Sequence, residues 1–307
     1  MSPSKSVVIS AYLGACLIWG STWLAIKVGL EGAPPLTGIA VRMTIASLVV
    51  FVILRARHIP LPAEKRFATA GVFLGFFHIV LPYTLVYYAE QHIPSGLAAV
   101  LYAAMPLVVA LIARYTIGDR LTPRKIAGIA AGMAGVAVIF SDSLRIGREQ
   151  ALGAGAVIVS MLAASVGSVA TKRWMRGYHP LASLQIPFVT GAVVAWLLAL
   201  LVEGVVPLRF SPLTWGSIVY LAVLGSVTAF TLFFFVIQHL DVTTVSYQTF
   251  VIPVIAVLLG WAVLGETISV RVLVGALMIL AGVSLAIMAP GARKRRDGLE
   301  AAQSGHP

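Results

Sequence analysis

Charged residues are scarce in this chain, and this bounds the class of protein to which it belongs. Asp, Glu, Lys and Arg make up 11% of the 307 residues, whereas soluble globular domains carry about 25%. Hydrophobic residues make up 59%, and the mean hydropathy is +0.97. This composition excludes an ordinary soluble domain and predicts that most of the chain lies in a lipid bilayer.

Cysteine is almost absent, and so are the motifs of cofactor and enzyme chemistry. The single Cys16 excludes an intramolecular disulfide and a multi-cysteine metal site. The sequence contains no P-loop, no Asp-rich magnesium motif, no zinc-ligand cluster and no nucleophile elbow. We therefore predict no cofactor, no metal, no use of ATP and no enzymatic activity. A membrane-embedded enzyme is the main alternative from another class of protein.

Carboxylates are missing from the predicted depth of the membrane. All eleven acidic residues fall in predicted loops, tails or the last turn of a helix. Proton-coupled exporters of cationic drugs commonly need a carboxylate at membrane depth, which binds the cation and is discharged by a proton. The absence argues against a proton-coupled multidrug efflux pump, which is the alternative function. It leaves His78 as the candidate proton carrier.

The chain has instead a series of apolar runs of about 20 residues, the length that crosses a hydrocarbon layer of about 30 Å. Hydrocarbon satisfies no backbone polar groups, so each run is predicted to be a helix. The runs cover residues 7–30, 35–54, 67–89, 95–116, 124–140, 152–173, 180–202, 213–237, 243–263 and 270–289. The sequence thus predicts an all-α integral membrane protein with ten transmembrane helices. We expect the first run to be retained rather than cleaved as a signal peptide.

Much of the stretch from Gln91 to Val136 recurs 147 positions later. The offset aligns Pro106 with Pro253, Gly118-Asp119 with Gly265-Glu266, and Ala134-Gly135-Val136 with Ala281-Gly282-Val283. Each copy then holds five helices, and because five is odd the second copy must be upside down relative to the first. We predict an inverted 5+5 structural repeat, with residues 7–140 and 152–289 as the two repeats.

Basic residues indicate the orientation in the membrane. With the N-terminus inside, fifteen Lys and Arg lie on the inner face and four on the outer face, the bias expected of cytoplasmic loops. We expect residues 1–6 and the basic tail 290–307 to be cytoplasmic. Because the basic clusters lie between apolar runs, the net charge of +11 is a topology signal and predicts no nucleic-acid partner.

The turns Gly118-Asp119-Arg120-Leu121-Thr122 and Gly265-Glu266-Thr267-Ile268-Ser269 begin the fifth and tenth predicted helices. With the prolines of the fourth and ninth helices, they resemble the drug/metabolite transporter superfamily and its EamA family. Within it the chain looks most like the YddG-type amino-acid exporters. The resemblance implies a pathway lined by helices one, three, four, six, eight and nine. It also implies export of aromatic and other neutral amino acids from a bacterial cytoplasm across the inner membrane.

The first and third helices supply candidate pathway residues. Trp19, Trp23 and Lys27 share one face of the first helix, where the indoles would stack on an apolar or aromatic ligand. Lys27 either meets a carboxylate or snorkels to the headgroups. In the third helix His78 and Pro82 share a face and Tyr83 follows. The alternatives are a neutral histidine bonded to a neighbouring helix, and tyrosines of an interfacial belt.

The fourth, sixth and ninth helices supply the remaining candidates. The ninth carries a polar group at membrane depth, and its members either hold the amino and carboxyl groups of a zwitterion or join neighbouring helices. The face with Ser168 is typical of helix packing, and Ser168 is retained as a pathway candidate. The candidates in these helices are Tyr102, Ser168, Tyr247, Gln248 and Thr249.

Three prolines, Pro82, Pro106 and Pro253, are the predicted hinges. Alternating access would rock the two repeats about a midplane site, and an inverted repeat favours this over a channel. The expected partners are a small neutral zwitterion and the lipid bilayer. A monomer is sufficient because one chain holds both repeats. Arg42 lies within the second span and requires a partner or a wet cavity.

Overall fold

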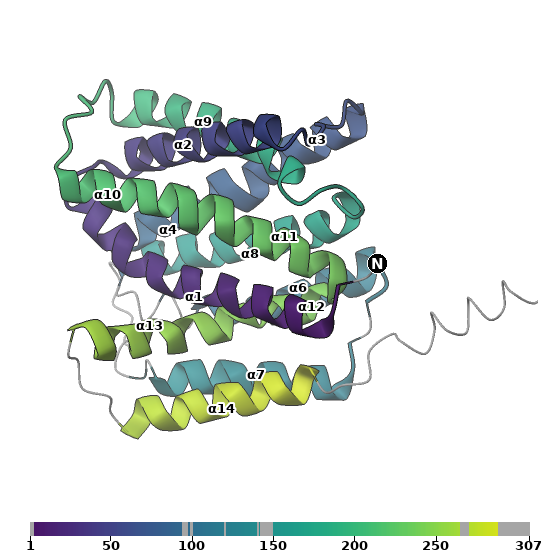
Figure 1. Cartoon of the computed structure of the whole chain (residues 1–307). Helices are drawn as coiled ribbons and strands as arrows, with labels where there is room; N and C mark the ends of the chain where they lie inside the picture. The colour runs from purple at the N-terminus through teal and green to yellow at the C-terminus, as the bar shows by residue number, and fades with distance from the viewer. Residues whose placement is uncertain are drawn as a thin grey trace, which may run out of the picture.

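A computed structural model describes residues 3–93, 98, 101–119, 121–139, 141, 150–264 and 270–287 of the chain. Within these ranges every regular element is helical (Figure 1). For some helical residues, Trp23 and Lys27 among them, only the backbone is described. The prediction of an all-α protein is confirmed for the described part of the chain.

The helices follow one another with short connections. Two of them, η1 and η4, are π-helical segments that continue directly from the α-helix before them into the one after. The bounds are α1 (Lys5–Leu30), α2 (Pro35–Ala56), α3 (Lys65–Leu74), η1 (Gly75–Val80), α4 (Leu81–Ala89), α6 (Met105–Thr116), α7 (Pro123–Ile139), α8 (Ala151–Trp174), α9 (Ala182–Val202), α10 (Pro212–Tyr220), η4 (Leu221–Thr228), α11 (Ala229–His239), α12 (Val242–Ser246), α13 (Gln248–Leu264) and α14 (Val270–Ile287).

Local sequence explains where several helices begin and end. The hydroxyls of Ser4 and Ser211 accept from backbone N–H groups three residues later, at 3.4 and 3.1 Å, and so cap α1 and α10. Gly118, Gly177 and Gly204 follow α6, α8 and α9 with φ of 71°, 88° and 74°. Glycine adopts this left-handed conformation without the penalty of a side chain, so it ends a helix readily.

Five helical stretches are long and apolar enough to cross a membrane: α2, α3–η1–α4, α8, α9 and α10–η4–α11. Shorter apolar helices lie at Met105–Thr116, Val242–Ile255 and Leu273–Leu285. Helices α1, α2, α8 and α9 begin and end within two residues of the predicted spans. Membrane-spanning helices are therefore confirmed, and their arrangement as ten helices in an inverted repeat stays a prediction.

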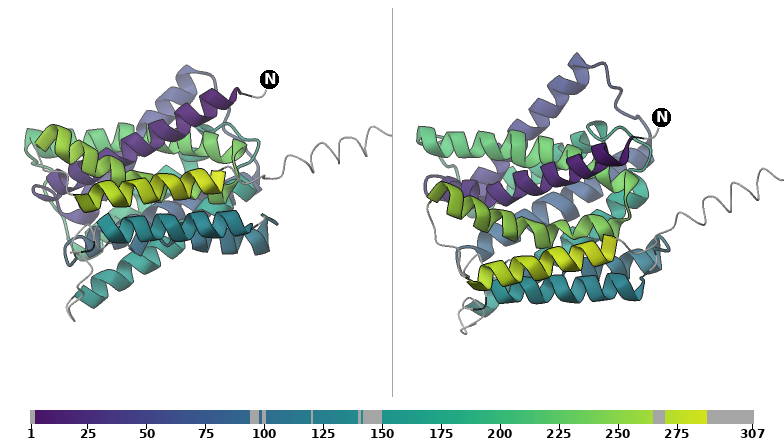
Figure 2. Two further views of the ribbon diagram at one scale, coloured as in Figure 1. Left: turned by 90° about the horizontal axis from the view of Figure 1, so that it is seen from below. Right: turned by 60° about the horizontal axis from the view of Figure 1, so that its bottom comes forward.

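The helices form a bundle with a pair of packed helices at each side. Helix α2 packs along α9 at one side, and α7 packs along α14 at the other (Figure 1). Both views in Figure 2 keep α7 and α14 side by side. Between these pairs lie α1 with α11 and α13, and α8 with α4 and α6.

The element bounds recur with the offset found in the sequence. Shifting η1 by 147 positions gives 222–227, which lies inside η4 (Leu221–Thr228). The first residues of α2, α3 and α7 shift onto the first residues of α9, α10 and α14. The two π-helical segments share almost no sequence, so this correspondence is a feature of the backbone beyond the aligned motifs.

Glycines bring α7 and α14 into close contact in a reciprocal way. A Cβ placed on Gly135 would lie 2.6 Å from the carbonyl oxygen of Gly275, and a Cβ on Gly282 would lie 2.7 Å from the carbonyl oxygen of Gly128. The offset of 147 turns the first pair into the second. Only glycine lets the two backbones approach this closely, as at other helix crossings in membranes.

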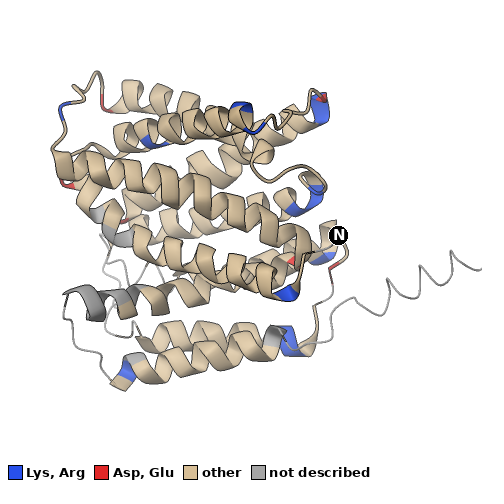
Figure 3. Ribbon diagram, viewed as in Figure 1, with Lys and Arg blue, Asp and Glu red and all other residues tan. Residues whose placement is uncertain are grey.

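Charge is distributed unevenly over the bundle. Figure 3 shows most Lys and Arg at the end that carries the N-terminus, and few at the opposite end. The outer faces of the helices are apolar, with exposed residues such as Leu48, Val52, Leu197 and Leu200. An apolar surface of this kind suits lipid contact.

Candidate substrate pathway

An aromatic cluster joins α1, η1 and α11 in the middle of the bundle. Trp19 meets Phe230 and Phe233 with ring centroids 5.4 and 5.7 Å apart. His78 meets the same two rings edge-on, at 5.6 and 5.4 Å. The indole N–H of Trp19 donates to the Gly225 carbonyl of η4 at 3.1 Å. These contacts bring together two residues predicted from different helices, Trp19 and His78.

The position of His78 depends on the helix opposite. A Cβ on Gly167 of α8 would lie 2.6 Å from the Cβ of His78, so the glycine makes room for the imidazole. The Nδ1 of His78 lies 3.4 Å from the hydroxyl of Thr171, also on α8. His78 is therefore buried against neighbouring helices and the aromatic cluster, and its place on the pathway stays a prediction.

A second cluster surrounds Arg42 of α2. Its Nε donates to the hydroxyl of Ser226 in η4 at 3.0 Å, and its Nη2 donates to the hydroxyl of Tyr83 at 3.2 Å. The guanidinium also lies over the Tyr83 ring, 4.6 Å from the centroid, within the range of a cation–π contact. Arg42 is only 3% exposed. Tyr83 is thus a partner of a buried cation.

A third group links the fourth span to α4 and α8. The hydroxyls of Tyr102 and Ser160 lie 2.8 Å apart, and Ser160 also donates to the carbonyl oxygen of Pro82 at 3.0 Å. Pro82 is buried and directly follows the π-helical η1, where a proline that lacks an N–H is tolerated. Tyr102 and Pro82 therefore meet through one shared serine.

The remaining candidates form local contacts instead. Ser168 donates to the carbonyl of Ala164, and Thr249 to that of Ser246, both within their own segments. Tyr247 is fully buried and stacks on Phe250 with centroids 6.0 Å apart. Gln248, also buried, begins α13. The structure does not bring this group to the aromatic cluster around Trp19.

Two of the predicted helices that contain a proline, the fourth and the ninth, are interrupted. The fourth span breaks at the turn residues Ala103 and Ala104 before α6, with Pro106 in its first turn. The ninth breaks at Tyr247, between α12 and α13, with Pro253 inside α13. The sequence predicted each as one continuous helix, and the structure interrupts each before its proline.

Some predictions fall outside the described residues. The side chains of Trp23 and Lys27 are not described, and neither are residues 265–269 of the second turn or residues 290–307 of the basic tail. In the first turn, the hydroxyl of Thr122 accepts from the N–H of Lys125 at 3.3 Å and so supplies the cap of α7. Within the described part of the chain, no three metal-ligating side chains gather.

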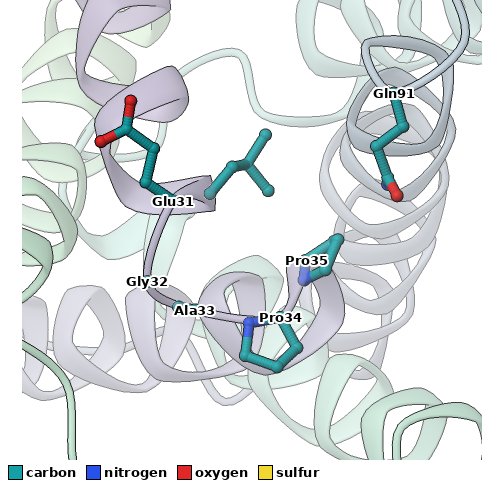
Figure 4. A pocket seen from close by; sticks show the side chains of 7 residues that line it. Glu31, Gly32, Ala33, Pro34, Pro35 and Gln91 are labelled. Atoms are coloured by element: carbon teal, nitrogen blue, oxygen red, sulfur yellow. The ribbon is translucent and has the colours of Figure 1, made fainter.

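A hollow opens at the end of the bundle opposite the N-terminus. It has a volume of about 350 Å³ and is lined by Leu30, Glu31, Gly32, Ala33, Pro34, Pro35 and Gln91. Figure 4 shows Glu31, in the turn after α1, and Gln91, in the turn after α4, across the hollow from each other, with Pro34 and Pro35 between them. This volume lies at the low end of small-molecule sites.

A narrow cavity continues inward from this hollow. It shares Leu30, Ala33 and Pro34 with the hollow, and it reaches Arg42 and Tyr87. Its volume is about 10 Å³, close to the space of one water molecule. Arg42 therefore lines a small cavity that shares one wall with the hollow.

At the opposite end, charged side chains join the two halves of the chain. Lys125 Nζ lies 3.3 Å from Asp119 and 3.1 Å from Asp241. The hydroxyl of Thr243 donates to Asp119 at 3.1 Å across the halves, whereas Lys172 donates to two backbone carbonyls at the end of α11 within the second half. The ion pair that joins the halves lies at the N-terminal end, whereas at the end with the hollow Glu203 after α9 accepts from the N–H groups of Leu36 and Thr37 at 2.8 Å.

Glu90 is an unusual carboxyl beside the hollow, one residue after α4. Burial raises the pKa of the Glu90 carboxyl to about 7. Its Oε1 atom is buried and accepts no hydrogen bond from a described residue. The sequence placed Glu90 among the acidic residues of loops, tails and helix ends, and it gave no sign that the Oε1 atom is buried.

The sequence also missed most partners in these clusters. Phe230 and Phe233 belong to an apolar run with no special spacing, and Ser226 looks like one of many small residues in a membrane helix. Arg42 was the one residue whose position in the sequence indicated a buried partner, because it is a cation well inside a span. Its position 184 residues before Ser226 gave no sign of where the partner lies.

Membrane-spanning helices, buried polar and aromatic clusters between them, and a hollow at one end define a helical membrane transporter. The chain belongs to the EamA-like transporter family, whose model matches residues 6–141 and again 151–288. The family and the similar proteins named below are transporters, not enzymes.

Several curated proteins are similar over nearly the whole chain. "Uncharacterized transporter YoaV" of Bacillus subtilis is 25% identical over 277 residues, 90% of this chain and 95% of that protein. "Uncharacterized inner membrane transporter YedA" of Escherichia coli K12 is 29% identical over 271 residues, 85% and 84%. "Probable terminal-alkyne amino-acid exporter" of Streptantibioticus cattleyicolor is 28% identical over 288 residues, 91% and 93%. A solved crystal structure with 22% identity superposes with a TM-score of 0.79 over 92% of this chain and 97% of that one, which supports the fold.

Proposed function

We propose that this protein is a secondary transporter of the bacterial inner membrane that exports neutral amino acids with apolar or aromatic side chains, or similar small metabolites. The observation that carries the proposal is the chemistry of the buried clusters. Aromatic rings at Trp19, Phe230 and Phe233 suit an apolar body, and Arg42 is the charged side chain among them. The amino-acid exporter among the similar proteins supports the same substrate class.

Alternating access is the proposed mechanism, with Pro82, Pro106 and Pro253 as hinges. The recurrence of element bounds after 147 positions and the reciprocal glycine contacts of α7 and α14 support two structural repeats related by inversion. The bridged N-terminal end and the hollow at the opposite end suit one state of such a cycle. With the basic residues inside, the hollow faces out of the cell.

Efflux of cationic drugs is the competing function, and Arg42 weighs against it. A buried guanidinium stays protonated, and it repels a cation that approaches through the narrow cavity. No described carboxylate lies within ion-pair distance of Arg42 to reverse this field. The cluster therefore favours a solute that carries a negative group.

Flux into proteoliposomes of the purified protein tests the proposal. Labelled phenylalanine, tryptophan, methionine and threonine are supplied with and without a pH gradient. We expect saturable uptake of the apolar and aromatic amino acids that does not follow the gradient. Uptake that follows the gradient and disappears in His78→Ala would instead make His78 a proton carrier. Transport of a cationic dye without amino-acid flux would contradict the proposed substrate.

A further inference from the structure

We infer that Arg42 binds the carboxylate of the transported solute, and that the solute reaches it from the hollow at the end opposite the N-terminus. This inference rests on the proposed function, because it assigns one group of the substrate to one side chain of the pathway. It concerns a residue of α2, a helix that the family resemblance did not place along the pathway.

The first step is the charge of Arg42, which has no described carboxylate within ion-pair distance. The side chain is 3% exposed, and a guanidinium remains protonated in proteins. The ion pairs among described residues all involve Lys125, at the N-terminal end. An isolated buried charge is strongly unfavourable unless a counter-charge or several hydrogen bonds stabilise it.

The second step is that the partners of Arg42 orient it without neutralising it. Ser226 and Tyr83 accept hydrogen bonds through neutral hydroxyls, and the Tyr83 ring lies below the guanidinium. Gly225 leaves space beside Nη2, because a Cβ there would lie 3.4 Å from this atom. The guanidinium is thus held in a fixed position with its full charge, which is the arrangement needed to bind a carboxylate through two parallel hydrogen bonds.

The third step is access. Arg42 lines the narrow cavity, and this cavity meets the outer hollow at Leu30, Ala33 and Pro34. The structure thus places Arg42 on a small cavity that one wall separates from the hollow. In the proposed path, movement of these three shared residues joins the two spaces.

The fourth step is the kind of solute that fits. Ile26, Ile218 and Leu221 line the narrow cavity, and they suit an apolar side chain. Among the described lining residues, Arg42 is the one cation, and Glu31 of the outer hollow is the one anion. One charge of each sign suits a zwitterion with a single carboxylate, whereas a phosphate dianion would require further cations.

Binding to the purified protein tests the inference separately from transport. The probes are L-phenylalanine, 3-phenylpropionate, 2-phenylethylamine and phenyl phosphate, which share a ring and differ in their charged groups. Affinity is measured by isothermal titration for the wild type, Arg42→Gln, Arg42→Lys and Ser226→Ala. Arg55→Gln is the matched control, because Arg55 is an exposed arginine at the other end of the same helix. Size-exclusion chromatography checks that each variant is folded.

We expect the wild type to bind phenylalanine and phenylpropionate and not phenylethylamine. Arg42→Gln should weaken both by at least tenfold, Arg42→Lys and Ser226→Ala should weaken them less, and Arg55→Gln should bind like the wild type. If Arg42→Gln does not fold, Ser226→Ala tests the inference instead, because this variant keeps the cation. We then expect it to bind the two carboxylate probes more weakly than the wild type.

The remaining outcomes separate the inference from the proposed function. Unchanged carboxylate binding in Arg42→Gln would overturn the inference and leave amino-acid export intact. If Arg42→Gln does not fold, unchanged carboxylate binding in a folded Ser226→Ala would have the same consequence. Binding of phenylpropionate through Arg42 without binding or flux of any amino acid would support the site and overturn the proposed substrate. A wild type that binds only phenylethylamine, or that prefers phenyl phosphate to both carboxylates, would overturn the site as a carboxylate site.

Discussion

Arg42 and Glu90 are ionisable residues at the same end of the bundle, and the surroundings of their polar atoms differ. Arg42 has hydroxyl partners and a ring beneath it, so its charge is held in place. Glu90 has a buried oxygen that accepts no hydrogen bond from a described residue. A carboxyl without partners is more stable protonated, and this is why its pKa lies near 7.

The raised pKa of Glu90 predicts that the stability of the protein depends on pH. Because its pKa is about 7 in the folded protein and 4.5 in a free side chain, the folded state holds a proton that the unfolded state has lost. Its contribution is fully present below about pH 4.5 and is lost as the pH rises through about 7. Thermal unfolding in detergent between pH 5 and pH 8.5 should show the melting temperature falling with pH.

Two variants separate Glu90 from the other carboxyls. Glu90→Gln should remove most of this fall and raise the melting temperature at pH 8.5. Glu31→Gln changes an exposed carboxyl at the same end and should keep the wild-type profile. A Glu90→Gln profile that matches the wild type would show that Glu90 is not the group that titrates.

Hydropathy predicted where the helices begin and end well, but it did not predict irregular geometry within them. Runs of apolar residues gave the bounds of α2 and α9 within two residues, because a span must match the bilayer. The π-helical η1 and η4 were not predicted, since each depends on contacts with the opposite half and neither shares a motif with the other. Tyr247 was predicted to line the pathway as a member of the polar group of the ninth helix. Its ring stacks on Phe250, a contact that its polarity did not indicate, and its place on the pathway stays a prediction.

The close contact of α7 with α14 leads to a second prediction, which concerns the stability of glycine variants. In Gly135→Ala the new methyl would lie 2.6 Å from the backbone of Gly275, and overpacking of this kind is destabilising by about 1–3 kcal/mol. The melting temperature should fall by several degrees for a chain of this size. Gly155→Ala is the matched control, because a methyl at Gly155 of α8 has nothing within 4 Å.

We expect Gly155→Ala to melt at or slightly above the wild-type temperature, since alanine favours the helix over glycine. Gly282→Ala, which changes the reciprocal contact, should resemble Gly135→Ala. Wild-type melting in both contact variants would mean that α7 and α14 separate more easily than their close approach suggests.

In the whole molecule, the two ends of the bundle differ. Lys125 links the turn after α6 to Asp241 in the other half at the N-terminal end, while the opposite end holds the hollow. A carrier that alternates must break the bridged end to release or accept solute there. These contacts are therefore expected to set the balance between the two states.

Asp241→Asn tests this role of the bridge. Loss of a partly exposed ion pair removes up to about 1 kcal/mol, which shifts a two-state equilibrium about fivefold. With Cys16 changed to alanine and Ser246 to cysteine, maleimide labelling of the buried position 246 should be about fivefold faster in Asp241→Asn. Arg57→Gln, an exposed change at the same end, should label at the parent rate. Equal rates in all three proteins would exclude the bridge as a gate.

The central claim is that this chain is a carrier for neutral amino acids, and solute counterflow tests it most directly. Proteoliposomes are loaded with unlabelled phenylalanine and diluted into a trace of labelled phenylalanine, with no ion gradient. A carrier with alternating access should accumulate label above its equilibrium level for a time, because inward and outward movements share one site. Label that only equilibrates would contradict alternating access, and label that does not enter would contradict the proposed substrate.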